Sequence, residues 1–166
     1  MKQVTISAMQ SEHWVRVAEI YRSGIETKLA TFESSVPTWE HWNATHLSFA
    51  RLVAIVDNRI EGWAALAPVS SRKVYSGVAE VSVYVDTTFR SQGCGSLLLE
   101  TLIAESERNN IWTLQASIFS ENERSLRLHL KSGFREVGRR FKIARLDGEW
   151  KDTILLERRS STVGTR

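Results

Sequence analysis

The chain has 166 residues, of which 42% are apolar and 25% charged, with nine Gly, two Pro and a formal net charge of +3. This composition is typical of a globular protein and excludes disordered, collagen-like and solenoid chains. The length predicts a single domain over residues 1–158, and the polar residues 159–166 predict a disordered tail.

Apolar spacing in the first half of the chain predicts a mixture of strands and helices. The predicted elements are a strand near residues 4–6, helices over 11–24 and from 38, and strands over 52–56, 60–67 and 79–85. In the last of these strands, alternation places three valines on one face and Glu80, Ser82 and Tyr84 on the other.

The second half continues with the same mixture. Its predicted elements are a helix over 95–108, a strand over 112–119, a helix over 122–133, and strands over 134–137, 141–146 and 153–157. A strand-helix-strand unit lies at the centre of the chain, so we expect an α/β or α+β sandwich.

A cluster of basic residues lies between Arg135 and Arg145, with Glu136 as its only acidic member. Such a cluster either attracts an anionic partner, such as a nucleic acid or a phosphorylated cofactor, or is the solvated surface of a strand pair. It lacks interleaved aromatic residues and any recognition-helix pattern, so we expect no nucleic-acid partner.

Two glycines one residue apart, Gly93 and Gly95, stand between the predicted strand 79–85 and the predicted helix 95–108. Such glycines allow a tight turn, and a helix N-terminus offers unpaired N–H groups to an anion such as a diphosphate. The segment lacks the lysine of a P-loop and the third glycine of a dinucleotide fingerprint. A plain structural turn is the alternative.

Arg90-x-x-Gly93-x-Gly95, after Val83-Tyr84-Val85, resembles the acetyl-CoA signature of the GCN5-related N-acetyltransferases (GNATs). The likeness continues through Asn122-x-x-Ser125 and Gly133-Phe134, and elements consistent with that fold cover about residues 3–158. The resemblance implies a mixed, mostly antiparallel sheet that splays in the middle, flanked by helices. Acetyl-CoA would be the acetyl donor. The cofactor-binding residues that it implies are Val83, Tyr84, Val85, Arg90, Ser91, Gln92, Gly93, Cys94, Gly95, Ser96 and Asn122.

Three further segments, within 25–33, 75–85 and 125–129, are similar to the phosphinothricin and methionine sulfoximine N-acetyltransferase branch. In that branch, the position of Glu80 is a catalytic carboxylate and that of His129 a second proton-transfer residue. An amine attacking a thioester must lose a proton, which makes a nearby carboxylate useful. The alternatives are a solvated Glu80 and a structural His129, and an acid, a base or an orienting role for His129 stays open.

Arg72 and Tyr75 are the candidate substrate-binding residues, together with Phe32. The planar guanidinium of Arg72 matches the geometry of a carboxylate or oxyanion, and the two aromatic rings could wall a pocket. A charged, exposed loop is the alternative for Arg72.

Cys94 is the only cysteine, which excludes an intramolecular disulfide and indicates a reducing compartment. No histidine lies near Cys94 in sequence to activate it, so we expect no role for it as a nucleophile. The four histidines show no metal-ligand spacing, and we expect no metal. No signal-peptide or membrane-span pattern is present, so we expect a cytoplasmic protein without membrane contact.

The sequence therefore predicts an enzyme that moves acetyl from acetyl-CoA to the α-amine of phosphinothricin, methionine sulfoximine or methionine sulfone. The alternatives are a GNAT enzyme acting on protein N-termini or polyamines, and a non-catalytic acyl-CoA-binding regulator. Relatives in the branch are homodimers, and the chain has six tryptophans, some of which could serve an interface, so we expect a homodimer.

Overall fold

The structure, a computed structural model, describes residues 2–166. Its helices are α1 (Trp14–Glu26), α2 (Trp39–Thr45), α3 (Cys94–Arg108) and α4 (Glu123–Lys131). Its strands are β1 (Thr5–Ala8), β2 (Leu52–Val56), β3 (Arg59–Pro68), β4 (Val78–Val85), β5 (Thr113–Phe119), β6 (Arg135–Leu146) and β7 (Glu149–Arg159). The mixture of helices and strands expected from the sequence is confirmed.

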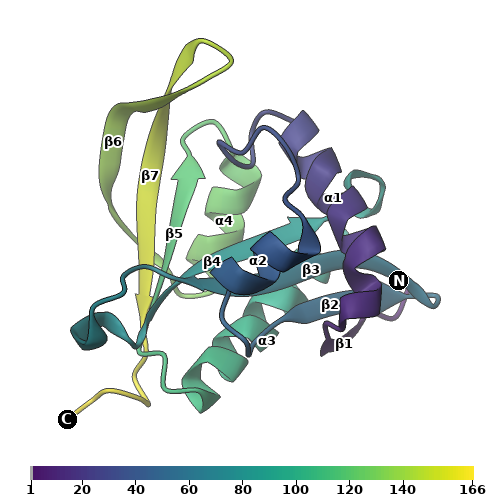
Figure 1. Cartoon of the computed structure of the whole chain (residues 1–166). Helices are drawn as coiled ribbons and strands as arrows, with labels where there is room; N and C mark the ends of the chain where they lie inside the picture. Colours follow the sequence, from purple (N-terminus) through teal and green to yellow (C-terminus); the bar gives the residue numbers. More distant parts are fainter. Residues whose placement is uncertain (1) are drawn as a thin grey trace.

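The seven strands form one sheet in the order β1-β2-β3-β4-β5-β7-β6. Every neighbouring pair is antiparallel except β4 and β5, which run parallel. Their connection contains α3, as a parallel crossover requires. Figure 1 shows the sheet with helices on both of its faces. The predicted mixed, mostly antiparallel sheet is therefore confirmed.

The sheet opens between β4 and β5. These strands pair only over 78–80 and 113–115, although β4 pairs with β3 as far as Val85 and β5 pairs with β7 as far as Phe119. From Val81 onward, the edge of β4 that faces β5 has no strand partner. The predicted splay in the middle of the sheet is thus a consequence of these short shared residue pairs.

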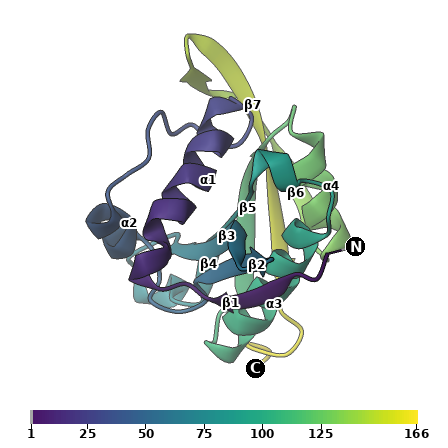
Figure 2. The ribbon, with the colours of Figure 1, turned by 90° about the vertical axis from the view of Figure 1, so that its right-hand side faces the viewer.

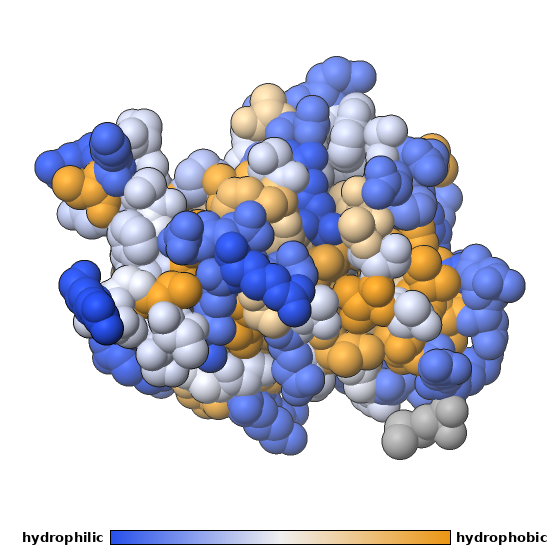
Figure 3. Space-filling view, turned by 90° about the horizontal axis from the view of Figure 1, so that it is seen from below, coloured by the Kyte–Doolittle hydropathy of each residue, from blue (hydrophilic) through white to orange (hydrophobic). Residues whose placement is uncertain are grey.

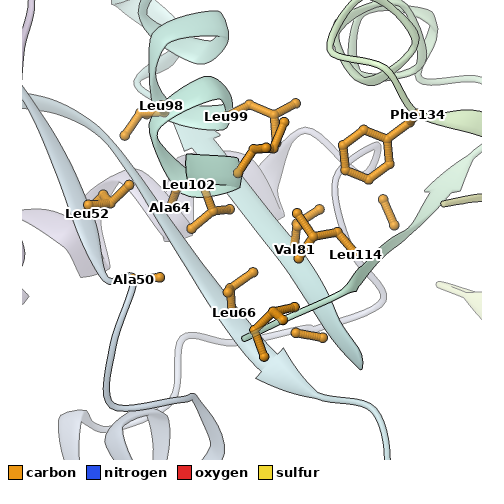
Figure 4. Close-up of a cluster of buried hydrophobic side chains, with 14 of the residues drawn as sticks. Ala50, Leu52, Ala64, Leu66, Val81, Leu98, Leu99, Leu102, Leu114 and Phe134 are labelled. Carbon is orange, nitrogen blue, oxygen red and sulfur yellow. The ribbon is translucent and has the colours of Figure 1, made fainter. Parts of the chain in front are cut away.

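Alternation along the strands feeds two separate cores. On one face, α3 places Leu98, Leu99 and Leu102 against the sheet, and all three are fully buried (Figure 4). On the other face, Trp42 of α2 and Trp63 of β3 are fully buried beside α1. Figure 2 shows α1 and α3 separated by the sheet.

Most of the tryptophans belong to the core on the α1 face. Trp14 and Trp39 pack against the core on the α1 face, where they contact Trp42 with ring centroids 5.5 and 5.8 Å away. Trp150 of β7 is different, because half of its surface is exposed. Four of the six tryptophans (residues 14, 39, 42 and 63) therefore serve this core.

The C-terminal strands are longer than the apolar spacing indicates. The two strands predicted over 134–137 and 141–146 form the single strand β6, which contains an irregularity between Arg140 and Ala144. The spacing misled because β6 is an edge strand, exposed along most of its length. Residues 160–166 carry no helix or strand, and the buried hydroxyl of Ser160 donates to Glu107 over 2.8 Å.

The basic cluster of β6 faces carboxylates of β7. Arg135 forms an ion pair with Glu157 at 2.6 Å, and Arg139 forms one with Asp152 at 2.7 Å. These contacts favour the interpretation of the cluster as the solvated surface of a strand pair.

Seen from below, the molecule presents a patch of apolar residues beside polar and charged ones (Figure 3). Within residues 2–166, no helix combines the length and apolarity needed to cross a membrane.

Candidate active site

A cleft of about 850 Å³ occupies the opening between β4 and β5. It is lined by residues within 24–33, 80–85, 90–96, 116–119 and 121–131, and by Thr153 of β7. The opening in the sheet therefore continues as a cavity that joins the C-terminal end of β4, the first turn of α3 and the first turns of α4.

At one end of the cleft, the chain turns from β4 into α3. Gly93 precedes the helix with a φ of 80°, a conformation that favours glycine. Within residues 2–166, no hydrogen bond uses the amide N–H groups of residues 91–96. Because unpaired amides and the positive end of the helix dipole coincide here, this turn can bind an anion such as a diphosphate.

Basic side chains strengthen this anion site. Arg90, Arg124 and Arg127 line the cleft. Burial lowers the pKa of Arg90, and the nearby positive charge of Arg124 lowers it further. Two guanidinium groups that repel each other in this way are stabilised by a bound polyanion such as a diphosphate.

An ion-pair network fixes the end of β4 next to this turn. Arg16 of α1 contacts Asp86 at 2.5 Å and Glu61 of β3 at 3.3 Å, and both carboxylates are buried. Asp86 also accepts hydrogen bonds from the amide and hydroxyl of Thr88 at 2.8 and 2.7 Å. Burial alone would raise the pKa of Asp86, but the hydrogen bonds from Thr88 and Arg16 outweigh it and hold the pKa below its usual value.

The second glycine, Gly95, lies between α4 and the end of β4. A Cβ atom at Gly95 would lie 3.4 Å from Leu128 of α4 and 3.7 Å from Val85 of β4. The turn, the unpaired amides and the cationic side chains therefore fit the diphosphate of coenzyme A. The unpaired edge of β4 fits an extended chain that carries amide groups.

Glu80 stands at the other end of the cleft, where β4 and β5 separate. Its register partner on β5 is Gln115, whose Nε2 donates to Oε2 of Glu80 over 2.9 Å. This hydrogen bond holds one carboxylate oxygen. Within residues 2–166, the other oxygen has no hydrogen-bond partner, so it remains available to accept a proton or a water molecule.

His129 lies on α4 and is buried against the ring of Phe134, with ring centroids 5.0 Å apart. Its Nδ1 is 2.8 Å from the carbonyl oxygen of Ser125. A carbonyl only accepts, so Nδ1 carries a proton and Nε2 of the neutral ring is an acceptor. Burial lowers the pKa of His129, and the bond to Ser125 offsets this only in part. At neutral pH the ring is therefore uncharged, with Nε2 free of a proton.

Comparison with known proteins agrees with this geometry. The model of the acetyltransferase (GNAT) family matches residues 14–134, which is more than half of the chain. This protein is a GNAT acetyltransferase. Its fold and family identify it as an acetyl-CoA-dependent N-acetyltransferase.

Two relatives carry named activities. A phosphinothricin N-acetyltransferase of Alcaligenes faecalis is 30% identical over 160 residues, which are 93% of this chain and 81% of that protein. An L-methionine sulfoximine/L-methionine sulfone acetyltransferase of Pseudomonas aeruginosa is 26% identical over 132 residues, 70% of this chain and 77% of that protein.

A solved structure shows the fold. The acetyltransferase is similar to a GNAT superfamily phosphinothricin acetyltransferase from Sinorhizobium meliloti, solved in complex with acetyl-CoA, with a TM-score of 0.90 and 22% identity. The likeness covers 98% of this chain and 91% of that one.

The acetyltransferase brings most of the residues singled out from its sequence into the cleft. Glu80, His129 and Phe32 line it, as do all the cofactor candidates except Gln92. Asn122 caps α4 by accepting from the amide of Ser125, and its Nδ2 donates to the carbonyl oxygen of Leu29. Arg72 and Tyr75 do not line the cleft of this chain. They lie before β4, with the guanidinium 5.6 Å from the ring centroid of Tyr75.

Cys94 is unsuited to nucleophilic chemistry. It is the first residue of α3 and is fully buried. Burial, together with the charge of Glu61, raises the pKa of its thiol to about 11. The thiol therefore stays protonated at neutral pH and packs as a small apolar side chain.

Sequence reasoning missed several residues of the site, among them Arg124 and Arg127 of the anion site and three residues of the sheet. Gln115 and Phe119 lie on the predicted strand 112–119, and Thr153 lies on the last predicted strand. The signal that places Gln115 beside Glu80 is the parallel register of β4 and β5, and the signal for Thr153 is its pairing with Phe119. Both are tertiary pairings, which one sequence does not specify.

We expect Gly93→Ala to weaken both folding and acetyl-CoA binding. A Cβ at Gly93 meets no atom within 4 Å, but the φ of 80° strains an alanine there. The free energy of unfolding should fall by about 1–2 kcal/mol. Because the strained turn displaces its amides, the Kd for acetyl-CoA should rise severalfold. Urea denaturation and isothermal calorimetry measure the two effects.

Gly138→Ala is the matched control. A Cβ at Gly138 also meets nothing within 4 Å, and its φ is not positive. This variant should keep its acetyl-CoA affinity and change the free energy of unfolding by less than about 1 kcal/mol. Equal behaviour of the two variants would show that the turn does not depend on its left-handed glycine.

The lowered pKa of His129 predicts a loss of stability in mild acid. The unfolded chain binds a proton at His129 near pH 6.5, whereas the folded protein does so only at lower pH. The free energy of unfolding should therefore decrease as pH falls from about 6.5 through the lowered pKa. Burial also lowers the pKa of His46, which adds to the same slope.

His129→Gln isolates the contribution of His129. Denaturant unfolding between about pH 5 and 8 should show a smaller acid slope for this variant than for the wild type, with parallel curves above pH 7.5. An NMR titration of the His129 ring should have its midpoint below 6.5. A midpoint above 6.5 would contradict the assignment of a neutral ring.

Proposed function

We propose that this acetyltransferase acetylates the α-amine of a small amino-acid-like acceptor of the phosphinothricin, methionine sulfoximine and methionine sulfone class. The observation that carries the proposal is the position of Glu80 at the point where β4 and β5 separate, in the cleft that also holds the anion-binding turn. The named activities of the two relatives support this acceptor class.

The donor end of the cleft binds and orients. When bound, acetyl-CoA supplies the acetyl group as a thioester. The amides of residues 91–96 and the guanidinium of Arg90 would hold its diphosphate. The unpaired edge of β4, near Val83–Val85, offers backbone amides to polarise the thioester carbonyl, and fixed donors of this kind are commonly worth about 3 kcal/mol.

The acceptor end manages protons. An α-amine is mostly protonated at neutral pH and must lose a proton before it attacks. Glu80 accepts that proton, directly or through water, and Gln115 keeps its carboxylate turned toward the cleft. The neutral ring of His129 presents Nε2 as a second proton acceptor. Arg72, predicted from the sequence to bind the acceptor carboxylate, lies before β4 and outside the cleft lining, so it would take this role only if its loop moved toward Glu80.

A thiol-release assay across a panel of amines tests the proposal. Phosphinothricin, methionine sulfoximine and methionine sulfone should release coenzyme A at least tenfold faster than spermidine or a peptide N-terminus. Preference for spermidine or the peptide would favour the other GNAT acceptors. If no amine causes release of coenzyme A, although acetyl-CoA still binds in calorimetry, the result would favour a non-catalytic regulator.

On the best acceptor, Glu80→Gln should lower kcat about 10²–10³-fold and leave the Kd for acetyl-CoA unchanged, because a general base acts on the reacting amine. Steady-state kinetics and calorimetry separate the two effects. The control is Glu136→Gln, an exposed carboxylate on β6, which should keep the wild-type kcat. Wild-type turnover in Glu80→Gln would remove Glu80 from the mechanism.

We also propose that the protein is a homodimer. The β6–β7 hairpin exposes a group of large apolar side chains, namely Val137, Phe141, Ile143 and Trp150. Such an apolar group on an exposed hairpin is suited to pack against the same group of a second protomer. Light scattering should give twice the monomer mass, and Phe141→Lys should shift it toward the monomer. A monomer mass for the wild type at about 50 μM would contradict the dimer.

A further inference from the structure

One face of the sheet joins Glu80 to a residue far from it in sequence. Glu80 pairs with Gln115 on β5, and Phe119 lies four residues later on the same face, because side chains alternate along a strand. Phe119 in turn pairs with Thr153 of β7. Ser117 shares this face, whereas Ala116 and Ile118 point to the opposite face, where they join the α3 core. Thr153 therefore belongs to the face that carries Glu80.

The hydroxyl of Thr153 is buried without a partner. The residue is 3% exposed, and within residues 2–166 its Oγ1 makes no hydrogen bond. The two other buried groups in this condition are the indole nitrogens of Trp42 and Trp63, which lie in the core on the α1 face. Thr153 is the one of the three that lines the cleft.

The apolar surroundings of Thr153 give no reason for a hydroxyl group at this position. Its cross-strand neighbour Phe119 contacts Phe32 edge-on, with ring centroids 4.7 Å apart. Valine would fill the same volume beside these rings without burying an unpaired polar atom, which is a disfavoured arrangement. A threonine at such a position is accounted for when a ligand supplies the missing partner.

We infer that Thr153 is a specificity-determining residue whose hydroxyl hydrogen-bonds the acceptor at the end remote from its reacting amine. The inference rests on the proposed function. Four residues of β5 span about 13 Å between Gln115 and Phe119. The side chain of Glu80 covers part of this span and a small amino-acid acceptor covers the rest.

The partner at Thr153 is a polar group such as a phosphinate, sulfone or sulfoximine oxygen. Glu33, which follows Phe32 in the chain, also lines the cleft. A carboxylate repels a second anion but not a hydroxyl, so Thr153 provides a neutral donor for an oxygen-rich side chain on a wall that includes acidic residues. Its hydroxyl can also accept, which fits the imine nitrogen of a sulfoximine.

Thr153→Val and Thr153→Ser test the inference on the best acceptor of the panel. Thr153→Val should raise the acceptor KM about tenfold, the effect of one lost hydrogen bond, and leave the KM for acetyl-CoA within about twofold. Thr153→Ser keeps the hydroxyl and should stay close to the wild-type acceptor KM. The Tm of Thr153→Val should equal or exceed that of the wild type, because no paired group is lost.

Thr101→Val is the matched control. The hydroxyl of Thr101 on α3 donates to the carbonyl oxygen of Leu97 over 2.8 Å, away from the cleft. This variant should keep both KM values. A lowered Tm with unchanged kinetics in Thr153→Val would assign Thr153 to the fold alone.

The outcomes separate this inference from the proposed function. An unchanged acceptor KM in Thr153→Val, on an acceptor that the wild type acetylates, overturns the inference and leaves the function intact. A raised KM for acetyl-CoA instead would place the hydroxyl on the donor. If the wild type acetylates none of the panel amines, the proposed function and this inference fail together.

Discussion

β4 and β5 share three parallel residue pairs and then separate, and the position of every functional group depends on that short pairing. A strand inside a sheet normally satisfies its backbone groups on both sides. From Val81 onward, β4 has a strand partner on the β3 side alone. An extended ligand with amide groups can take the place of the missing strand, so the opening both creates the cleft and selects the kind of molecule that enters it.

The turn into α3 adds direction to this opening. Its unpaired amides and the guanidinium of Arg90 gather positive charge at one end of the cleft, while Glu80 stands at the other. The turn keeps its position because Asp86, immediately after β4, is tied to α1 and β3 through Arg16. Removing Arg16 would leave the buried carboxylate of Asp86 without its ion-pair partner and Glu61 with Arg59 alone, and an unpaired buried charge costs several kcal/mol. The donor end is therefore held by charges that take no part in the reaction.

Local patterns in the sequence were enough to predict most of the helices and strands and to propose a donor site. The alternating valines of 79–85 and the glycines that follow them specify a strand, a turn and a helix, and the resemblance to a known signature assigns them a ligand. Contacts between residues on paired strands could not be predicted from the sequence. Nothing near Gln115 or Thr153 in the sequence indicates that one binds Glu80 and the other faces the cleft, because those relations come from the registers of β5 with β4 and β7. The single strand β6 was missed because an exposed edge strand lacks the apolar alternation of a buried one.

The separation of β4 from β5 also places the donor site and the acceptor wall in different halves of the molecule. The turn that fits the donor belongs to the half built from β1 to β4, whereas Phe119 and Thr153 belong to the half built from β5 to β7. Substitutions on β7 can alter the wall that faces the amine without disturbing the glycine turn or its ion pairs. A fold arranged in this way can diversify its acceptors over evolutionary time while every descendant keeps the same acyl donor.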